Sequence, residues 1–154
     1  MDAKKFILGE CIHAKNADVI LRQKVYEGAR KIYGNATDNV SIQECLNEEL
    51  KAILLYGLVN LFLHALDIVQ AVHSKGYKIG FRGTLGSSIV AFLLGLTEMN
   101  PLPHHYYCKE CGYLEFANSI NCEDKFLENK GCPRCHRTLE SDGYNLPFCF
   151  FISP

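Results

Sequence analysis

Residues 80–116, GFRGTLGSSIVAFLLGLTEMNPLPHHYYCKECGYLEF, contain the densest set of structural signals in this chain. A glycine-rich turn comes first, an apolar run follows at residues 89–96, and Pro101 and Pro103 then precede a C-x-x-C pair. Residues 77–81 (YKIGF) are typical of a short strand, and the apolar run after the turn is most simply a buried helix. This order of strand, loop, helix and cysteine pair predicts a mixed α+β fold.

Working downstream, four cysteines form two C-x-x-C pairs, Cys108 with Cys111 and Cys132 with Cys135. Each pair places two thiolates on a tight turn, and two such turns facing each other supply the tetrahedral sulfur set that zinc prefers. Four protein ligands leave no open position for water, so we expect structural zinc without hydrolytic chemistry. The alternatives are that a nearby histidine replaces one cysteine, or that the cysteines are free or disulfide-bonded.

The glycine-rich turn has the composition of a phosphate-binding loop. Its three glycines let the backbone approach a ligand, Ser87 and Ser88 offer hydroxyl groups at a helix start, and Arg82 offers a fixed positive charge. The sequence is neither a Walker loop nor a dinucleotide-binding G-x-G-x-x-G. From composition alone, a tight turn that merely packs on the sheet explains the glycines equally well.

Upstream of the loop, helical periodicity dominates. Apolar positions recur at helical spacing within residues 18–33, with Gly34 as the expected C-terminal cap. A capping box from Ser41 to Glu44 predicts the start of the next helix, which should pause at Gly57. After that pause we expect a largely buried helix with a narrow polar stripe. The stripe consists of Asn60, His64, Asp67 and Ala71.

Composition narrows the class of protein. The chain has 16 Lys and Arg against 17 Asp and Glu, so it has no bulk attraction to nucleic acid or to an acidic membrane. Its eight cysteines come without a recognisable signal peptide, which favours a metal site in a reducing, cytoplasmic compartment. Residues 53–72 are as long as a membrane span, but Asp67 at their centre argues against a transmembrane helix.

These motifs, in this order, resemble the palm of the PolC-type DNA polymerase III alpha subunit, a family C replicative polymerase. In that family a GSRGSVGSS-like loop, a helix, an ITEVNPLPPHY-like segment and a first C-x-x-C follow one another as they do in residues 80–116. Residues 142–148, DGYNLPF, are similar to the family's DGHDIPF, and residues 29–34, ARKIYG, to part of its ERAKELYGD segment. The resemblance covers roughly residues 18–148.

The resemblance implies a partial polymerase-beta-like nucleotidyltransferase palm, with a helical N-terminal part and a small four-cysteine zinc module. We expect a helical and palm segment at residues 1–103, the zinc module at residues 104–141, and a last segment at residues 142–154. In the last segment, residues 146–152 would return to the palm as a strand. Carried over position by position, the residues that bind the nucleotide phosphates would be Gly80, Arg82, Gly83, Thr84, Gly86, Ser87 and Ser88.

The sequence differs from the family pattern in two places, and both differences lower the activity that we expect. Phe81 stands where the family has serine, which removes one hydroxyl donor. The family holds two magnesium ions with aspartates from a PDIDLNFS-like strand, whereas no D-x-D or D-x-E occurs in this chain, and the adjacent acids Glu48 and Glu49 would diverge on a helix. We therefore expect no catalytic residue here, no magnesium ligands, and a chain that is inactive alone.

The predicted function is that of a fragment or truncated homologue of this DNA-synthesising polymerase subunit. By resemblance its partners would be deoxynucleoside triphosphate and primer–template DNA. The exposed palm edge would associate with a second copy or with the rest of the polymerase, and no membrane partner is expected. The alternative is a stand-alone zinc-containing module that binds nucleotide, DNA or a replication protein. A small phosphotransferase would require acidic metal ligands that the sequence does not display.

Overall fold

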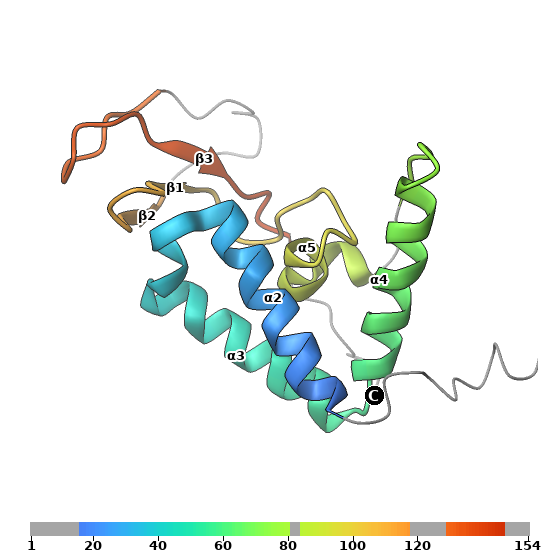
Figure 1. Cartoon of the computed structure of the whole chain (residues 1–154). Coiled ribbons are helices and arrows are strands. Elements are labelled where there is room, and N and C mark those ends of the chain that lie inside the picture. The colour runs from blue at the N-terminus through green and yellow to red at the C-terminus, as the bar shows by residue number, and fades with distance from the viewer. Residues whose placement is uncertain (1–15, 81–83, 118–128, 147–154) are drawn as a thin grey trace, which may run out of the picture.

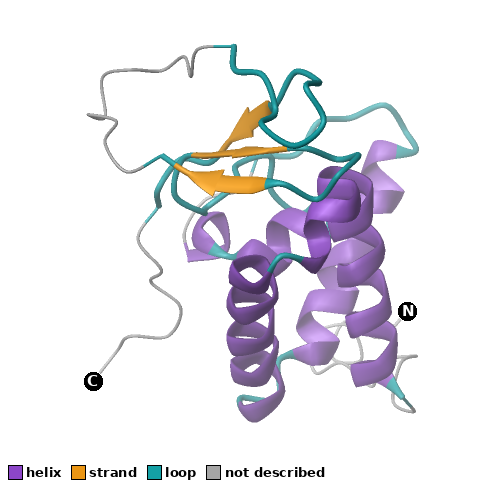
Figure 2. Ribbon diagram, turned by 90° about the vertical axis from the view of Figure 1, so that its left-hand side faces the viewer, coloured by secondary structure: helices purple, strands orange, loops and turns teal. Residues whose placement is uncertain are grey.

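The computed structural model describes residues 16–80, 84–117 and 129–146, which form a helical part with a small sheet across one end of it (Figures 1 and 2). The helices are α2 (Ala17–Tyr33), η1 (Gly34–Asp38), α3 (Val40–Leu55), α4 (Val59–His73), η2 (Thr84–Ser87) and α5 (Ile89–Leu93). The strands are β1 (His105–Tyr107), β2 (Leu114–Phe116) and β3 (Glu140–Asp142). The predicted α+β class is confirmed.

Helix α2 follows the predicted pattern and ends at the predicted glycine. One face is buried along its length, because apolar side chains recur every four residues at Leu21, Val25, Ala29 and Tyr33. Gly34 terminates the helix with a φ of 56°, a value that favours glycine, and its N–H donates to the carbonyl of Arg30. The expected helix and its C-terminal cap are therefore confirmed.

Helix α3 begins earlier than the capping box predicted. Asn39 is extended and caps the helix, because its side-chain oxygen accepts the N–H of Ser41 at 3.0 Å. The predicted cap at Ser41 is therefore wrong: asparagine is an equally good N-cap, and it comes two residues earlier. The buried face of α3 contains four aliphatic side chains and one carboxylate; its members are Ile42, Leu46, Glu49, Leu50 and Ile53.

Helices α3 and α4 are separated at the predicted pause. Gly57 has a φ of 66°, and the two helices are bent by 107° relative to each other. In the described ranges no single helix is long and apolar enough to cross a membrane, and only this bent pair meets the length and composition criteria together. Helix α4 buries one face, but Leu61 on the other side is 62% exposed and Ile68 is 43% exposed. The expectation of a largely buried helix is therefore wrong.

Two further elements differ from their predictions. Residues 77–80 form no strand, since the sheet within the described residues is built entirely from the cysteine-bearing part of the chain and offers them no partner. Helix α5 is shorter than the apolar run of residues 89–96, because Gly95 adopts a φ of 72° soon after it ends. Of the predicted return strand, Leu146 belongs to no element and the other residues lie outside the described ranges.

The small sheet has the order β2-β1-β3, with both pairs antiparallel. His105 lies opposite Phe116 on β2 and opposite Asp142 on β3. Tyr107, at the other end of the central strand, is buried and belongs to the same apolar core as the helices. The sheet is therefore continuous with the helical core on one side, although its strands come from the cysteine-bearing segment.

Candidate metal centre and glycine-serine loop

The four predicted cysteines come together in the folded chain. Their sulfur atoms all lie within 4.8 Å of one another, with 3.5 Å between Cys108 and Cys135 and 3.5 Å between Cys111 and Cys132. A tetrahedral site with metal–sulfur bonds of about 2.3 Å has edges of about 3.8 Å. The cluster can therefore hold one metal ion, in a geometry that suits structural zinc.

Both cysteine pairs are built on the same backbone turn. In the first, the N–H of Cys108 donates to the carbonyl of Tyr113 at 2.8 Å, and the N–H of Gly112 donates to the carbonyl of Cys108 at 3.1 Å. The second pair repeats these two bonds at 2.6 and 2.9 Å, with His136 in the place of Gly112. Gly112 has a φ of 74° and His136 a φ of 59°. The equivalent turns explain why the sulfurs of each pair converge on one point.

At Cys108, local hydrogen bonding favours the thiolate form that a metal ligand requires, whereas burial raises the pKa of the Cys111 thiol. A backbone hydrogen bond from Cys111 lowers the pKa of the Cys108 thiol, although burial acts in the opposite direction. Among the described residues the group of close ligand atoms consists of sulfurs alone, and no histidine nitrogen belongs to it. His105 is instead buried, with its Nδ1 2.7 Å from the carbonyl oxygen of Pro103. The geometry thus favours four cysteines over a mixed set.

The described residues of the cysteine-bearing segment (104–117 and 129–141), here called the cysteine module, are attached to the end of α2 and the start of η1. The N–H of Asn35 donates to the carbonyl of Lys109 at 2.9 Å, and its side-chain amide donates to the carbonyl of Glu110 at 2.6 Å. The rings of Tyr33 and Tyr107 meet edge to face with centroids 4.9 Å apart. No local sequence pattern predicts this attachment, since the partners lie about seventy residues apart.

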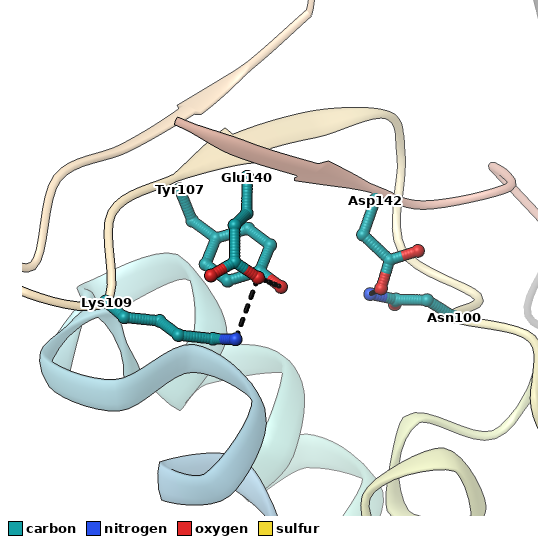
Figure 3. Close-up of polar contacts among 5 residues, drawn as sticks. All are labelled: Asn100, Tyr107, Lys109, Glu140 and Asp142. Carbon is teal, nitrogen blue, oxygen red and sulfur yellow. Dashed lines mark hydrogen bonds and ion pairs between the residues drawn. The ribbon is translucent and has the colours of Figure 1, made fainter. Parts of the chain in front are cut away.

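Strand β3 carries two carboxylates that point back toward the helical part (Figure 3). Glu140 forms an ion pair with Lys109 at 2.8 Å and accepts the hydroxyl of Tyr107 at 3.1 Å. Asp142, two residues further on, accepts the side-chain amide of Asn100 at 2.7 Å. The two acids share one face because side chains alternate along a strand. They therefore fasten β3 to the neighbouring segments.

Asn100 links this strand to the buried face of α2. Its side-chain N–H group also donates to the hydroxyl of Tyr33 at 2.7 Å, and its side-chain oxygen accepts the N–H of Leu102 at 3.2 Å. Burial raises the pKa of Tyr33 far above its ordinary value, so the phenol stays protonated. This network shows that the carboxylate of Asp142 serves a structural contact.

Five of the seven predicted phosphate-binding residues lie in the described part of the chain, and two do not. Gly80 is exposed, whereas Arg82 and Gly83 lie outside the described residues. Thr84, Gly86 and Ser87 form η2, and Ser88 caps α5 by accepting the N–H of Ala91 on its hydroxyl at 2.8 Å. The hydroxyl of Ser88 is fully buried and donates to the carboxylate of Glu49.

Glu49 is a site residue that sequence analysis missed. It is 2% exposed, and besides the Ser88 hydroxyl it accepts the N–H of Ile89 at 2.9 Å and that of Val90 at 3.5 Å. Burial raises the pKa of Glu49 to about 7, although its hydrogen bonds oppose the shift. A signal existed: Glu49 follows Leu46 by three residues and so falls on the apolar face of α3.

A cavity of about 300 Å³ adjoins this contact. Its walls come from α3, from the end of the glycine-serine loop (residues 80–88) and from the proline-rich segment after α5. Its lining residues are Cys45, Glu48, Glu49, Ser87, Ile89, Pro101, Leu102, Pro103 and Leu146. Ser87 is therefore the predicted loop residue that faces this open space.

Comparison with known proteins identifies close relatives. The family model for the bacterial DNA polymerase III alpha NTPase domain matches residues 19–154. A PolC-type DNA polymerase III from Thermotoga maritima is 43% identical over 143 residues, which are 90% of this chain and 10% of the relative. The PolC-type enzyme of Bacillus subtilis is 38% identical over 139 residues, again 90% and 10% of the two chains. The chain thus spans about a tenth of the length of these curated relatives.

Proposed function

This chain belongs to the family of bacterial PolC-type DNA polymerase III alpha subunits, and from this membership we propose that its glycine-serine loop (residues 80–88) binds the phosphates of an incoming deoxynucleoside triphosphate. The relatives are named as DNA polymerases, and the chain corresponds to about a tenth of each. Its proposed partners are therefore the nucleotide, primer–template DNA and the remainder of a polymerase. The finer fold that we propose for it is part of a nucleotidyltransferase palm.

The observation that carries this proposal is the accessible backbone at the first residue of the loop and near its end. A Cβ atom built on Gly80 or on Gly86 would meet no atom within 4 Å, so the main chain there is open to a ligand. Ser87, directly after Gly86, lines the cavity of about 300 Å³. Backbone amides and a hydroxyl beside open space are the groups that bind phosphate oxygens in glycine-rich loops.

The proposed binding residues remain those carried over from the family. Arg82 would supply the positive charge, the glycines would supply close backbone contact, and Ser87 would donate its hydroxyl. Ser88 would not contact the phosphates. Its buried hydroxyl would instead hold the end of the loop against the start of α5. The residues proposed to contact phosphate are Gly80, Arg82, Gly83, Thr84, Gly86 and Ser87, with Ser88 as the supporting residue.

For the four-cysteine cluster we propose a structural zinc ion, which would cross-link the two cysteine turns and stabilise the small sheet. We assign no magnesium site and no catalytic residue, because the chain has no D-x-D or D-x-E sequence and the carboxylate of Asp142 is bonded to Asn100. The chain would thus contribute nucleotide positioning and structural support, and the reacting metal ions would need carboxylates from elsewhere.

A nucleotide titration tests this function. On addition of deoxyadenosine triphosphate to the zinc-loaded chain, we expect the backbone amide signals of residues 83–87 to shift, with weak affinity because no metal ion neutralises the triphosphate. Arg82→Ala should weaken binding about tenfold, since it removes a charged hydrogen-bond donor. Arg22→Ala, which removes an exposed arginine on α2, is the matched control and should bind as the wild type does.

Unchanged amide signals at saturating nucleotide would show that the loop is only a structural turn. Primer extension by the same samples, with magnesium and four deoxynucleotides, should yield no product. Extension that disappears in Arg82→Ala would instead mean that carboxylates of this chain do bind the catalytic metals.

A further inference from the structure

We infer that Glu49 is a positioning residue for the glycine-serine loop, which it holds at the junction between Ser88 and α5. The inference rests on the proposed phosphate-binding function of that loop. Glu49 lies on α3, about forty residues before the loop, and it contacts no nucleotide in this proposal. Its effect would be exerted through the groups to which it bonds.

The contacts of Glu49 are concentrated on three consecutive residues. One carboxylate oxygen accepts the Ser88 hydroxyl, and the other accepts the N–H of Ile89 at 2.9 Å and the N–H of Val90 at 3.5 Å. All three partners are buried, as is Glu49 itself. A buried carboxylate that accepts several hydrogen bonds fixes the geometry of its donors, because breaking any bond leaves a polar group unsatisfied.

The same contacts determine which amides are left for a ligand. In the first turn of α5, the N–H groups of Ile89 and Val90 bond to Glu49, and that of Ala91 bonds to the Ser88 hydroxyl. No ion pair to Glu49 occurs among the described residues, so its partners there are hydrogen-bond donors. Phosphate oxygens should therefore contact the loop before Ser88 and leave the start of α5 unchanged.

Four variants of the full 154-residue chain separate positioning from general stability. Glu49→Ala removes all three contacts, whereas Glu49→Gln retains an oxygen acceptor and places an N–H group beside the Ser88 hydroxyl. Glu44→Ala is the matched charge control, because Glu44 is exposed on the same helix and does not line the cavity of about 300 Å³. Ile53→Val, in the buried face of α3 one turn further on, is the control for lost packing.

Amide hydrogen exchange gives the first measurement. Exchange at Ile89 and Val90, relative to Val25 in α2, should accelerate about tenfold or more in Glu49→Ala. Glu49→Gln, Glu44→Ala and Ile53→Val should leave this ratio within about threefold of wild type, because the acceptor is retained. An unchanged ratio in Glu49→Ala would overturn the inference, whatever the loop binds.

Titration with deoxyadenosine triphosphate gives the second measurement. Glu49→Ala should weaken binding about tenfold, and Glu49→Gln should restore most of the affinity. Wild-type affinity in Glu49→Ala would show that Glu49 does not position the loop, while the proposed function stands. The inference is equally overturned if nucleotide shifts the signals of Ile89 and Val90 most, since phosphate would then displace Glu49. If the wild type binds no nucleotide, the proposed function fails and the exchange ratios alone decide whether Glu49 holds the loop.

Discussion

At the scale of single residues, the buried carboxylate of Glu49 is the feature with the largest physical consequence. Transfer of a carboxylate from water into an apolar core is costly unless hydrogen bonds replace the lost solvent. Glu49 obtains three such bonds from Ser88, Ile89 and Val90. Burial still raises its pKa from 4.5 to about 7, so the ionised form is less favourable in the folded chain than in the unfolded chain.

This shift predicts a specific pH dependence of stability. Between pH 4.5 and about pH 7 the folded state binds more protons at Glu49 than the unfolded state does, so stability should fall as pH rises through this window. Glu49→Gln cannot titrate, and the stability difference between it and wild type should change by roughly 2–3 kcal/mol from pH 5 to pH 8. Urea denaturation of both proteins across this range measures the difference.

Glu48→Gln is the control for this measurement, because Glu48 is exposed. The free energy of unfolding of this variant should change with pH in parallel with that of the wild type. A constant difference between Glu49→Gln and wild type from pH 5 to pH 8 would mean that the folded-state pKa of Glu49 is ordinary.

At the scale of elements, the sheet is too small to be stable alone. Each of the three strands β1, β2 and β3 has only three residues, and such short strands need packing or a cross-link to persist in water. The two cysteine turns lie next to these strands. The N–H of Cys108 donates to the backbone carbonyl of Tyr113, and the N–H of Cys132 donates to the backbone carbonyl of Arg137. A metal ion on the four sulfurs would therefore stabilise the sheet by fixing both turns.

Removal of the proposed zinc ion should loosen the sheet before the helices. We expect Cys132→Ser, or a strong chelator, to accelerate amide exchange at Cys108 and Ala117 much more than at Leu50, because Leu50 lies in the helical core. Cys45→Ser is the matched control, since Cys45 is a half-buried cysteine outside the cluster. Equal protection of Cys108 with and without the metal would contradict a structural role for the cluster.

At the scale of the whole molecule, the sheet and the helices are joined through a close backbone contact. Gly34, the cap of α2, lies against the cysteine module: a Cβ atom there would come within 2.6 Å of the carbonyl oxygen of Lys109. Next to it, Asn35 forms its hydrogen bonds to Lys109 and Glu110. The position thus has two requirements, a positive φ and the absence of a side chain.

Alanine substitutions at two glycines separate these requirements. Gly34 and Gly57 have φ values of 56° and 66°, but a Cβ at Gly57 would meet no atom within 4 Å. Gly57→Ala should therefore cost only the backbone strain, about 1 kcal/mol. Gly34→Ala should cost at least about 2 kcal/mol and also accelerate exchange at Asn35, because the module must move away from α2. Urea denaturation and amide exchange measure both effects, and equal costs would show that the close contact contributes nothing.

The features that could be predicted from the sequence are those that depend on near neighbours along the chain. The periodicity of residues 18–33, the cap at Gly34, the break at Gly57 and the two C-x-x-C turns all follow from local spacing, and each is present in the structure. The order of motifs also indicated the polymerase family, which the comparisons established. These predictions succeed because side-chain periodicity and turn chemistry act over a few residues.

Which distant groups meet depends on the packing of the folded chain and could not be predicted from local patterns. Among the acids of α3, packing selected Glu49 and not Glu48 to bond Ser88, and it paired Asn35 with Lys109 and Asn100 with Asp142. Of the strand expected at residues 77–81, the described residues 77–80 form no strand for the same reason, because a strand requires a partner and the described sheet is built from other segments. Many donors and acceptors in this sequence are chemically equivalent, and only the packing of helices and sheet brings particular pairs within hydrogen-bonding distance.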